Sequence, residues 1–411
     1  MKTILVLAYY YAPQTTSGAT RIVRFAHYLR EFGYRATVIS AGEARHAVRI
    51  STDSPEPLRA ARPSTVAQMQ TAAFGFGGRL LREYSERLAW APAAVEAGAT
   101  VLAGSPVSAI LSSSPPLAAH IAACRLSRHY GVPWIADFRD PFADNPFRQA
   151  PFRRFYDAPI ERLIVRNAAG IIANTDVAAD TWRKRYPEHR EKIHLIWNGF
   201  DPEEEFQPQP PPARARKVLA HVGDIYGPRH PGPIVEALDR LIAAGRLDPD
   251  RFSLRLIGPI DQQSAIWNIP AFGRLAERNC IAYNNAVLPR AEALREIATA
   301  DWLLLLDVGG EGRSIQVPAK IFDYLRAEHA VVAVTLPGSP AERILSKSGV
   351  SHACVYSGEP PAATEEKLLQ VFSEPAAGHR PNEWFWTQFN ARTQTGTLAE
   401  LLDKVALTEG K

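Results

Sequence analysis

Ile4-Leu-Val-Leu-Ala-Tyr9 opens the chain and is followed by a loop through Gly18 and then by Arg21-Ile-Val-Arg-Phe-Ala-His-Tyr-Leu-Arg-Glu-Phe32. A short continuous apolar run is typical of a strand buried on both faces, and the second stretch has apolar residues at helical spacing. The start resembles the apolar part of a signal peptide, but it holds three tyrosines, runs into Pro13 and lacks a small-residue cleavage site. The stretch therefore predicts a strand followed by a crossover helix.

The same alternation of apolar runs and amphipathic stretches recurs along the chain, as parallel sheets with helical crossovers require. In the first half the further strands are predicted at residues 36–40, 109–112, 134–138, 170–174 and 193–197. In the second half they are predicted at residues 218–222, 252–257, 302–307, 330–335 and 352–356. The main helices are predicted at 117–130, 233–243, 290–298 and 319–327, with a last one around 397–405.

A segment with five prolines, 201–216, separates the two series of strands and helices. Proline has no backbone N–H to donate, so this segment cannot form regular secondary structure and a linker is expected here. We predict an α/β protein with two doubly wound, Rossmann-like domains that face each other across a cleft, with ligands at the carboxyl ends of the strands. The expected boundaries are 1–203, a linker at 204–216, 217–382, and a terminal helical segment at 383–411 that returns to the first domain.

Composition excludes several classes of protein. Of 411 residues, 47 are Lys or Arg and 43 are Asp or Glu, a formal charge of +4 that argues against a nucleic-acid coat. With 46% hydrophobic and 22% charged residues, the chain is that of a globular protein. Three distant cysteines fit neither a disulfide framework nor a thiolate metal site, and no metal site is expected from the histidines. A cytoplasmic location is expected.

In the first half, polar residues follow two predicted strand ends. Gly18 opens a strand-to-helix loop where backbone N–H groups can approach an anion, and Arg21 adds charge, although an ordinary turn explains this glycine as well. Asp137, Arg139 and Asp140 follow the strand at 134–138. They fit either a ligand site or a structural Arg–Asp pair.

In the second half, Gly223 and Arg229 lie in a loop after a strand, and Arg229 suits a diphosphate. Lys320 and Asp323 share one face of the helix that follows a glycine-rich loop. They form either a surface ion pair, or a lysine that holds a phosphate and an aspartate that takes a ribose hydroxyl.

The segment 145–156 combines three arginines, Arg148, Arg153 and Arg154, with four aromatic residues and no acid. Such a segment suits an anionic lipid surface or a lipid-phosphate acceptor. A loop and helix with solvated arginines is the alternative, because two prolines interrupt any long amphipathic helix.

The chain resembles the family 4-like glycosyltransferases, which are retaining enzymes of the GT-B fold. The resemblance covers nearly the whole chain and rests on motifs in a fixed order: Tyr9-Tyr-Tyr-Ala-Pro-Gln14, Gly18, Arg24-Phe-Ala-His-Tyr-Leu-Arg-Glu-Phe-Gly-Tyr34, Ser112-Ser-Ser-Pro-Pro116, Ala136-Asp-Phe-Arg-Asp-Pro-Phe142, Trp197-Asn-Gly-Phe-Asp201, His221-Val-Gly223 and Val317-Pro-Ala-Lys-Ile-Phe-Asp-Tyr-Leu-Arg-Ala327. It implies a nucleotide diphosphate sugar as donor, bound mainly by the second domain. The implied diphosphate-binding residues are Gly18, Gly223, Arg229 and Lys320, and Asp323 is the implied nucleoside-binding residue.

The sequence departs from this family at two positions. Many relatives carry a glutamate eight residues before Asp323, where this chain has Ile315, and Glu311 is a candidate replacement. Many relatives also place a histidine where Arg139 stands, and a guanidinium cannot act as a base. The resemblance implies that the residues at the catalytic positions are Arg139, Asp140 and Glu311.

These observations predict a cytoplasmic glycosyltransferase, metal-independent and without a cofactor, that retains the anomeric configuration. Its expected acceptor is a surface polysaccharide, a lipid-linked glycan, another glycoconjugate or a small molecule. Arg21, Arg148, Arg153 and Arg154 are expected on the acceptor or membrane side, with peripheral contact to the inner membrane surface. A non-catalytic nucleotide-sugar-binding or complex-forming subunit, and an epimerase or phosphorylase on the same fold, stay open as alternatives.

Overall fold

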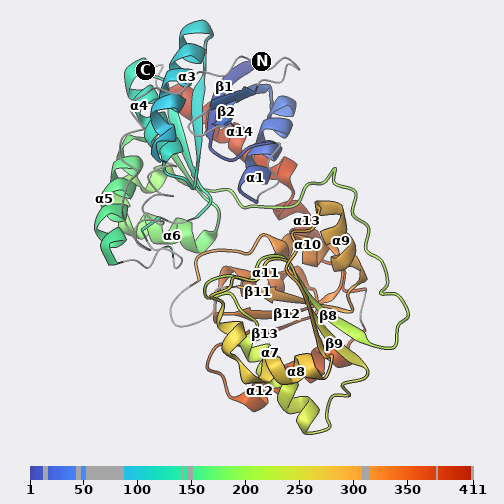
Figure 1. Ribbon diagram of the computed structural model, residues 1–411. Helices are drawn as coiled ribbons and strands as arrows, with labels where there is room; N and C mark the ends of the chain where they lie inside the picture. The colour runs from blue at the N-terminus through green and yellow to red at the C-terminus, as the bar shows by residue number, and fades with distance from the viewer. Residues whose placement is uncertain are drawn as a thin grey trace. The chain divides into compact units, whose positions relative to one another are not determined.

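The computed structural model describes residues 1–12, 17–42, 48–51, 88–140, 142–143, 145, 151–307, 314–375 and 378–408 (Figure 1). The chain divides into two compact units. The first comprises Met1–Asp201 together with Ala391–Lys411, and the second comprises Pro202–Asn390. The chain thus passes between the units at 201–202 and 390–391, whereas the sequence placed these boundaries at 203–204 and 382–383.

The first unit is built on a seven-stranded sheet with the order β3-β2-β1-β4-β5-β6-β7. All neighbouring strands are parallel except β2 and β3. The strands are β1 (Lys2–Ala8), β2 (Tyr34–Ala41), β3 (Val48–Ser51), β4 (Ala109–Ser114), β5 (Trp134–Phe138), β6 (Gly170–Ala173) and β7 (Ile193–Leu195). The order reverses between β1 and β4, which makes this edge of the sheet a topological switch point, where α/β proteins bind ligands.

Helices cover both faces of this sheet, as a doubly wound unit requires. They are α1 (Ser17–Tyr28), α3 (Trp90–Gly104), α4 (Ala118–Tyr130), α5 (Pro151–Asn167), α6 (Asp176–Arg185) and α14 (Ala391–Thr408). One core lies between the sheet and α3, α4 and α6, and a second lies between the sheet and α1 and α14. Figure 1 shows α14, in red, beside α1, where its Leu398 and Leu402 are buried with Ile22 and Phe25. The expected return of the terminal helix to the first unit is therefore confirmed.

The second unit has a six-stranded parallel sheet with the order β10-β9-β8-β11-β12-β13. Its strands are β8 (Lys217–Val222), β9 (Phe252–Ile257), β10 (Ile281–Asn284), β11 (Trp302–Leu306), β12 (Ala330–Thr335) and β13 (His352–Tyr356). Its helices are α7 (Gly232–Ala243), α8 (Pro270–Glu277), α9 (Arg290–Thr299), α10 (Lys320–Arg326), α11 (Pro340–Ser348), α12 (Pro361–Ser373) and α13 (Glu383–Gln388). The order reverses between β8 and β11, so the second switch point lies at the ends of these two strands.

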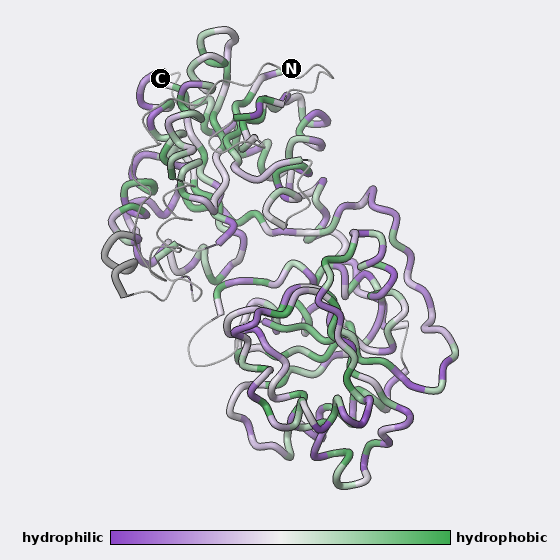
Figure 2. The backbone as a smooth tube through the Cα atoms, viewed as in Figure 1, coloured by the Kyte–Doolittle hydropathy of each residue, from purple (hydrophilic) through white to green (hydrophobic). Residues whose placement is uncertain are grey.

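Hydropathy follows this layering. Figure 2 shows hydrophobic residues concentrated along the inner strands and hydrophilic ones along many of the outer loops. The five residues of β11 are all buried, as a central parallel strand covered by helices on both faces demands. Within the described residues, no helix combines the length and the apolar character needed to cross a membrane.

The proline-rich segment contains neither helix nor strand between residues 202 and 216. It belongs to the second unit, because its side chains are bound there. Glu204 forms ion pairs with Arg290 and Arg326, and Arg326 also stacks on the Phe206 ring with 5.1 Å between the guanidinium carbon and the ring centroid. Arg214 pairs with Asp301 at the start of β11.

Candidate functional site

The turn after β8 brings two glycines into close contact at the switch point of the second unit. Gly223 has a φ of +128° and donates its N–H to the Ile257 carbonyl at 2.6 Å. Gly258, after β9, has a φ of +125°, and a Cβ there would stand 2.8 Å from the carbonyl carbon of Gly223. Both positions need glycine, because the φ values and the close approach disfavour a side chain. The result is a tightly packed backbone at the carboxyl ends of β8 and β9, in which Gly258 also donates its N–H to the Asn284 carbonyl at 2.8 Å.

Lys320, the first residue of α10, fills the space beside Gly223. A Cβ built on Gly223 would lie 1.9 Å from Cε of Lys320 and 2.5 Å from its Nζ. Burial and then the nearby charge of Arg229 lower the pKa of Lys320 to about 8, against the partial opposition of Asp224 and Asp323. The sequence-predicted Gly223, Arg229 and Lys320 are thus brought together.

Arg229 is oriented by its neighbour in the same loop. Its Nη1 donates to the hydroxyl of Tyr226 at 2.8 Å, and its guanidinium lies 5.4 Å from the centroid of that ring. An aromatic contact of this kind fixes a guanidinium while leaving it charged. Two cations at one strand end form an arrangement that suits a phosphate or diphosphate.

Asp323 lies one helical turn beyond Lys320, and its carboxylate forms an ion pair with a different cation. Arg290 at the start of α9 grips its two carboxylate oxygens at 2.6 and 2.7 Å, and the same guanidinium contacts Glu204 twice at 2.8 Å. Glu204 is desolvated, but its hydrogen bonds and ion pairs with Arg290 and Arg326 outweigh that and lower its pKa to about 2. The expected alternative of a Lys320–Asp323 ion pair is not among the ion pairs of the described residues. Each carboxylate oxygen has a second lone pair, so Asp323 retains capacity for a ribose hydroxyl.

Arg290 and Glu204 were not singled out from the sequence. The run Glu203-Glu-Glu205 in the proline-rich segment was a usable signal, because clustered acids next to a domain call for a basic partner. Which cation pairs with these acids depends on where α9 and α10 begin, and only the assembled sheet determines the positions of these two helices.

The end of β11 is held by hydroxyl groups. Asp307 accepts hydrogen bonds from Ser314 at 3.2 Å and from Thr335 at 2.8 Å, which ties the chain leading into α10 to the neighbouring strand β12. Ile315, at the position of the family glutamate, is buried with 5% of its surface exposed. Glu311 lies outside the described residues.

In the first unit, Arg21 and Asp137 form a buried ion pair. Arg21 Nη2 lies 2.9 Å from Asp137 Oδ1, with side-chain exposures of 4% and 0%. The remaining donors of Arg21 go to Asp137, to the carbonyls of Ile196 and Trp197, and to Asn198, so all five N–H groups are used. A guanidinium with every donor engaged in the interior joins α1 to β5 and to the chain after β7, and the expected place of Arg21 on the acceptor or membrane side stays a prediction.

Arg139, next to the end of β5, approaches Gly18 near the start of α1. A Cβ at Gly18 would stand 2.2 Å from Nη1 of Arg139. Asp140 follows at the same strand end and is half-buried. Gly18, Arg139 and Asp140 thus lie at the switch point of the first unit. Arg148 lies outside the described residues. Arg153 and Arg154 belong to α5, but their side chains lie outside the part of the chain that the structure describes.

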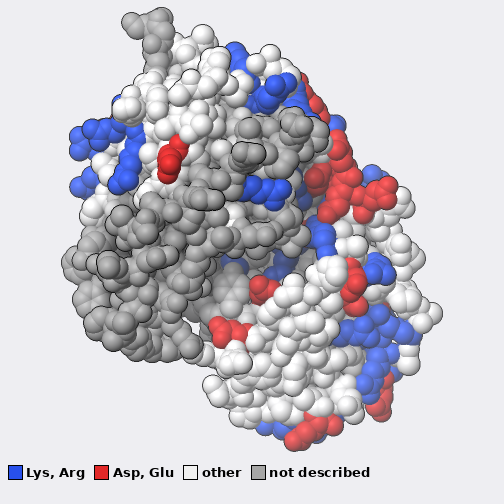
Figure 3. Space-filling model, turned by 45° about the horizontal axis from the view of Figure 1, so that its top comes forward, with Lys and Arg blue, Asp and Glu red and all other residues white. Residues whose placement is uncertain are grey.

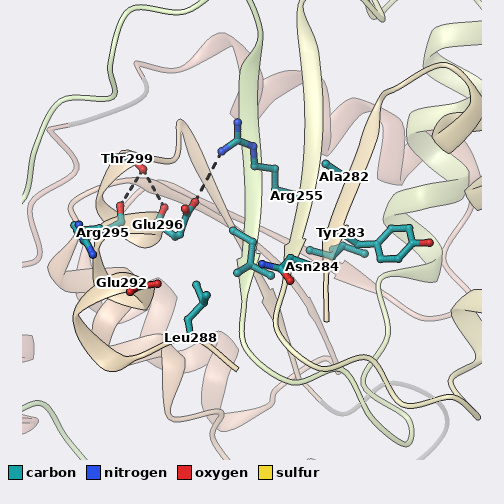
Figure 4. A pocket seen from close by; sticks show the side chains of 11 residues that line it. Arg255, Ala282, Tyr283, Asn284, Leu288, Glu292, Arg295, Glu296 and Thr299 are labelled. Carbon is teal, nitrogen blue, oxygen red and sulfur yellow. Dashed lines mark hydrogen bonds and ion pairs between the residues drawn. The ribbon is translucent and has the colours of Figure 1, made fainter. Parts of the chain in front are cut away.

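A groove of about 640 Å³ runs along the β10 edge of the second sheet (Figure 4). α9 forms its other wall, with Glu292, Arg295 and Glu296 facing strand residues such as Arg255 and Asn284. Arg255 Nη1 and Glu296 Oε2 are 3.8 Å apart across it. The lining mixes both charges with apolar side chains and contains neither Lys320 nor Asp323, so the groove is separate from the cationic strand end.

Charges of both signs occur in small groups on the face drawn in Figure 3. In the parts of the chain that the structure describes, no three His, Cys, Asp or Glu residues converge in a way that could hold a metal ion.

Comparison with known proteins bears on the first unit directly. Residues 17–199 match the family described as a glycosyl transferase 4-like domain. The first unit is thus similar to a glycosyl transferase 4-like domain. The family resemblance expected from the motifs is thereby confirmed, and the 4-like domain contains the Arg21–Asp137 pair and the Gly18–Arg139 contact. A comparison with curated protein sequences gave no match.

Solved structures resemble the whole chain. The Anabaena protein HepE in complex with UDP has a TM-score of 0.64 at 13% identity, over 98% of this chain and all of that one. Sucrose-phosphate synthase from Thermosynechococcus elongatus has a TM-score of 0.63 at 14% identity, over 100% and 98% of the two chains. Trehalose 6-phosphate synthase from Burkholderia multivorans has a TM-score of 0.63 at 14% identity, over 99% of both. The likeness confirms the predicted GT-B fold of two Rossmann-like units.

Proposed function

We propose that this protein is a glycosyltransferase that moves a sugar from a nucleotide diphosphate sugar to an acceptor with retention of the anomeric configuration. The proposal places the donor on the second unit, with its diphosphate at Gly223, Arg229 and Lys320 and its ribose at Asp323. The acceptor is a surface polysaccharide, a lipid-linked glycan, another glycoconjugate or a small molecule. The proposed reaction needs no metal and no cofactor, and the protein works in the cytoplasm, with peripheral contact to the membrane through Arg148, Arg153 and Arg154.

One observation carries this proposal: the Lys320 ammonium lies against Gly223 at the switch point, beside Arg229. Two like charges held together by the fold repel each other, and a diphosphate between them relieves that repulsion. The solved structures of HepE, which include complexes with UDP and with UDP-glucose, support a nucleotide-sugar at this kind of fold.

The chemistry follows from where negative charge grows. As the bond from the sugar to the diphosphate breaks, the leaving diphosphate gains charge, and fixed cations stabilise it without reorganising. Lys320 and Arg229 supply this stabilisation. In the proposed front-face route the leaving diphosphate accepts the proton of the acceptor hydroxyl as that oxygen bonds to the sugar. A double displacement would instead need a carboxylate nucleophile, for which Asp140 is the candidate, and Glu311 is the candidate to contact the transferred sugar.

Calorimetry with UDP, GDP, dTDP and ADP tests the donor site. One of these nucleotides is expected to bind, and Lys320→Ala is expected to weaken its affinity at least about tenfold, the equivalent of about 1.4 kcal/mol. Lys347→Ala, which removes an exposed lysine of α11 in the same unit, is the matched control and should leave affinity unchanged. Binding of none of the four, or equal affinity in the wild type and Lys320→Ala, contradicts the proposal.

A non-catalytic nucleotide-sugar-binding subunit is the second candidate function. The buried Ile315 in the place of the family glutamate favours it, since an alkyl side chain offers nothing to a transferred sugar. Slow hydrolysis of a nucleotide-sugar by the wild type, abolished by Asp323→Ala, would exclude this candidate. Binding without any turnover, in the presence of a panel of acceptors, would favour it.

A further inference from the structure

Arg290 holds two carboxylates at once at the start of α9. Its Nη1 and Nη2 donate to the two oxygens of Asp323, at 2.6 and 2.7 Å. Its Nε and Nη2 donate to the two oxygens of Glu204, each at 2.8 Å. A guanidinium presents its N–H groups as rigid planar forks, and each carboxylate here occupies one fork. Arg290 therefore fixes the plane of both carboxylates.

The position of Arg290 is unfavourable for the helix that it begins. Arg290 is the first residue of α9, and the partial positive charge of a helix N-terminus disfavours a cation there. Desolvation lowers the pKa of Arg290, but its hydrogen bonds and ion pairs with Asp323 and Glu204 outweigh this and raise the pKa. Arg290 thus stays charged, and the two carboxylates explain its place better than the helix does.

The fork leaves one side of the Asp323 carboxylate available. Each carboxylate oxygen has two lone pairs, of which Arg290 uses one. No other hydrogen bond reaches Asp323 from the described residues, and 12% of its side chain is exposed. The χ2 torsion of an aspartate is broad, so a free carboxylate loses rotational freedom when it binds a ligand. Arg290 removes that freedom before any ligand arrives.

The same ion pair keeps Asp323 apart from Lys320. These two residues lie one turn apart on the same face of α10, where a lysine and an aspartate can pair. Instead, Asp323 acts on the pKa of Lys320 only as a weak nearby charge, and Lys320 forms no ion pair with a carboxylate within the described part of the chain. The ammonium thus stays available to an anion, and the outer side of the carboxylate stays available to hydroxyl groups.

We propose that Arg290 is a positioning residue for nucleoside recognition: it holds the Asp323 carboxylate in the orientation in which its free lone pairs accept hydrogen bonds from the 2′- and 3′-hydroxyls of the donor ribose. Glu204 of the proline-rich segment holds Arg290 in turn. This role rests on the proposed function, because it needs a nucleotide whose ribose lies at Asp323. It makes the protein selective for ribonucleotides over 2′-deoxyribonucleotides.

The ratio of affinities for ribo- and deoxyribonucleotides tests the proposal. Calorimetry with UDP, GDP and ADP identifies the nucleotide that binds best, and its 2′-deoxy form is then measured on the same protein. We expect the wild type to favour the ribonucleotide about tenfold, because the deoxy form loses a hydrogen bond to a charged acceptor. Arg290→Gln should reduce this ratio to about twofold, because the carboxylate is no longer held in place.

Arg295→Gln is the matched control. It removes an exposed arginine from the same helix, on the wall of the separate groove in Figure 4, and should keep the wild-type ratio. A purely structural role of Arg290 would lower the thermal midpoint or weaken both nucleotides equally, and it would leave the ratio unchanged. An unchanged ratio in Arg290→Gln therefore overturns the inference while the proposed function stands.

The wild type alone gives two further outcomes. Equal affinity for the ribo and deoxy forms, or a preference for dTDP over UDP, GDP and ADP, overturns the role of Arg290 and leaves the diphosphate site standing. Binding of no nucleotide overturns the proposed function together with this inference. The two failures are thus distinguished in one series of titrations.

Arg290→Lys covers the case in which Arg290→Gln fails to fold. It keeps a positive charge between Asp323 and Glu204, but a single ammonium cannot hold both oxygens of a carboxylate in one plane. The ratio should still fall, and a wild-type ratio in the folded Arg290→Lys protein overturns the proposal. Glu204→Gln should lower the ratio less than Arg290→Gln does, and an unchanged ratio there overturns the part assigned to Glu204.

Discussion

Gly223 and Lys320 occupy adjoining space at the end of β8, so close that a Cβ on Gly223 would stand 1.9 Å from Cε of Lys320. The two residues are far apart in the sequence, and the parallel pairing of β8 with β11 brings them together. The glycine lets the lysine lie flat against the backbone at the strand end. Ligand affinity at this site should therefore depend on the glycine as much as on the lysine.

Gly223→Ala should weaken nucleotide binding about tenfold or more, because the new methyl group forces the Lys320 side chain out of its place. The positive φ of Gly223 adds strain that is independent of the lysine. Gly245→Ala is the control, since Gly245 has a φ of +67° but no neighbour within 4 Å. Calorimetric affinity and the thermal midpoint are measured for both. A loss of stability in both variants with unchanged affinity in Gly223→Ala would contradict this.

Nucleotide affinity should fall as pH rises through about 8. The lowered pKa of Lys320 means that its ammonium loses its proton there, whereas a normal lysine stays charged up to about 10.5. Anion binding favours the charged form, so the complex should take up a proton near pH 8, which appears as a binding enthalpy that varies with the ionisation enthalpy of the buffer. Lys320→Met should show neither effect. A pH-independent affinity between 7 and about 9 in the wild type would exclude the lowered pKa.

The pKa of Lys320 also has a consequence for stability with a fixed sign. Burial lowers the pKa of Lys320 relative to its value in the unfolded chain, so the buried ammonium destabilises the folded state. This destabilisation is complete below about pH 8 and disappears as the pH rises toward 10.5. The stability of the wild type should therefore rise relative to Lys320→Met over this interval. Urea unfolding at a series of pH values measures the difference between the two proteins.

Arg21→Met should destabilise the first unit by about 3–5 kcal/mol, because it leaves the Asp137 carboxylate buried without its partner. Lys2→Met is the control, since the Lys2–Asp403 pair is 54% and 53% exposed and such pairs contribute at most about 1 kcal/mol. Urea titration followed by tryptophan fluorescence gives both values. Equal effects of the two variants would show that the buried pair has no special importance.

Leu402→Ala should destabilise the first unit by about 2–5 kcal/mol, because Leu402 of α14 is fully buried in the core beneath α1. Leu407→Ala on the same helix should have little effect, since Leu407 is 76% exposed. Thermal unfolding of the two variants compares them directly. A neutral Leu402→Ala would mean that α14 does not contribute to the first core.

Two strands escaped prediction for a common reason. β10 buries only Ile281, while Ala282, Tyr283 and Asn284 are exposed, and β3 pairs on one side at the edge of the first sheet. Edge strands lack the continuous apolar run by which central strands are recognised. Their pairing is decided by the neighbouring strand and leaves little trace in local sequence.

The sequence by itself determined the central strands, the helices α1, α4, α7, α9, α10 and α14, the two-unit organisation and the strand ends at which Gly223, Lys320 and Arg139 lie. Local periodicity and the rule that ligands bind at the carboxyl ends of parallel strands suffice for these, since both act over a few residues. The tertiary structure alone decided which charges pair. Asp323 is bound by Arg290, 33 residues away, and Arg21 by Asp137, 116 residues away. Coulombic partners are chosen by distance in space and by desolvation, and those become defined only when the sheets are assembled.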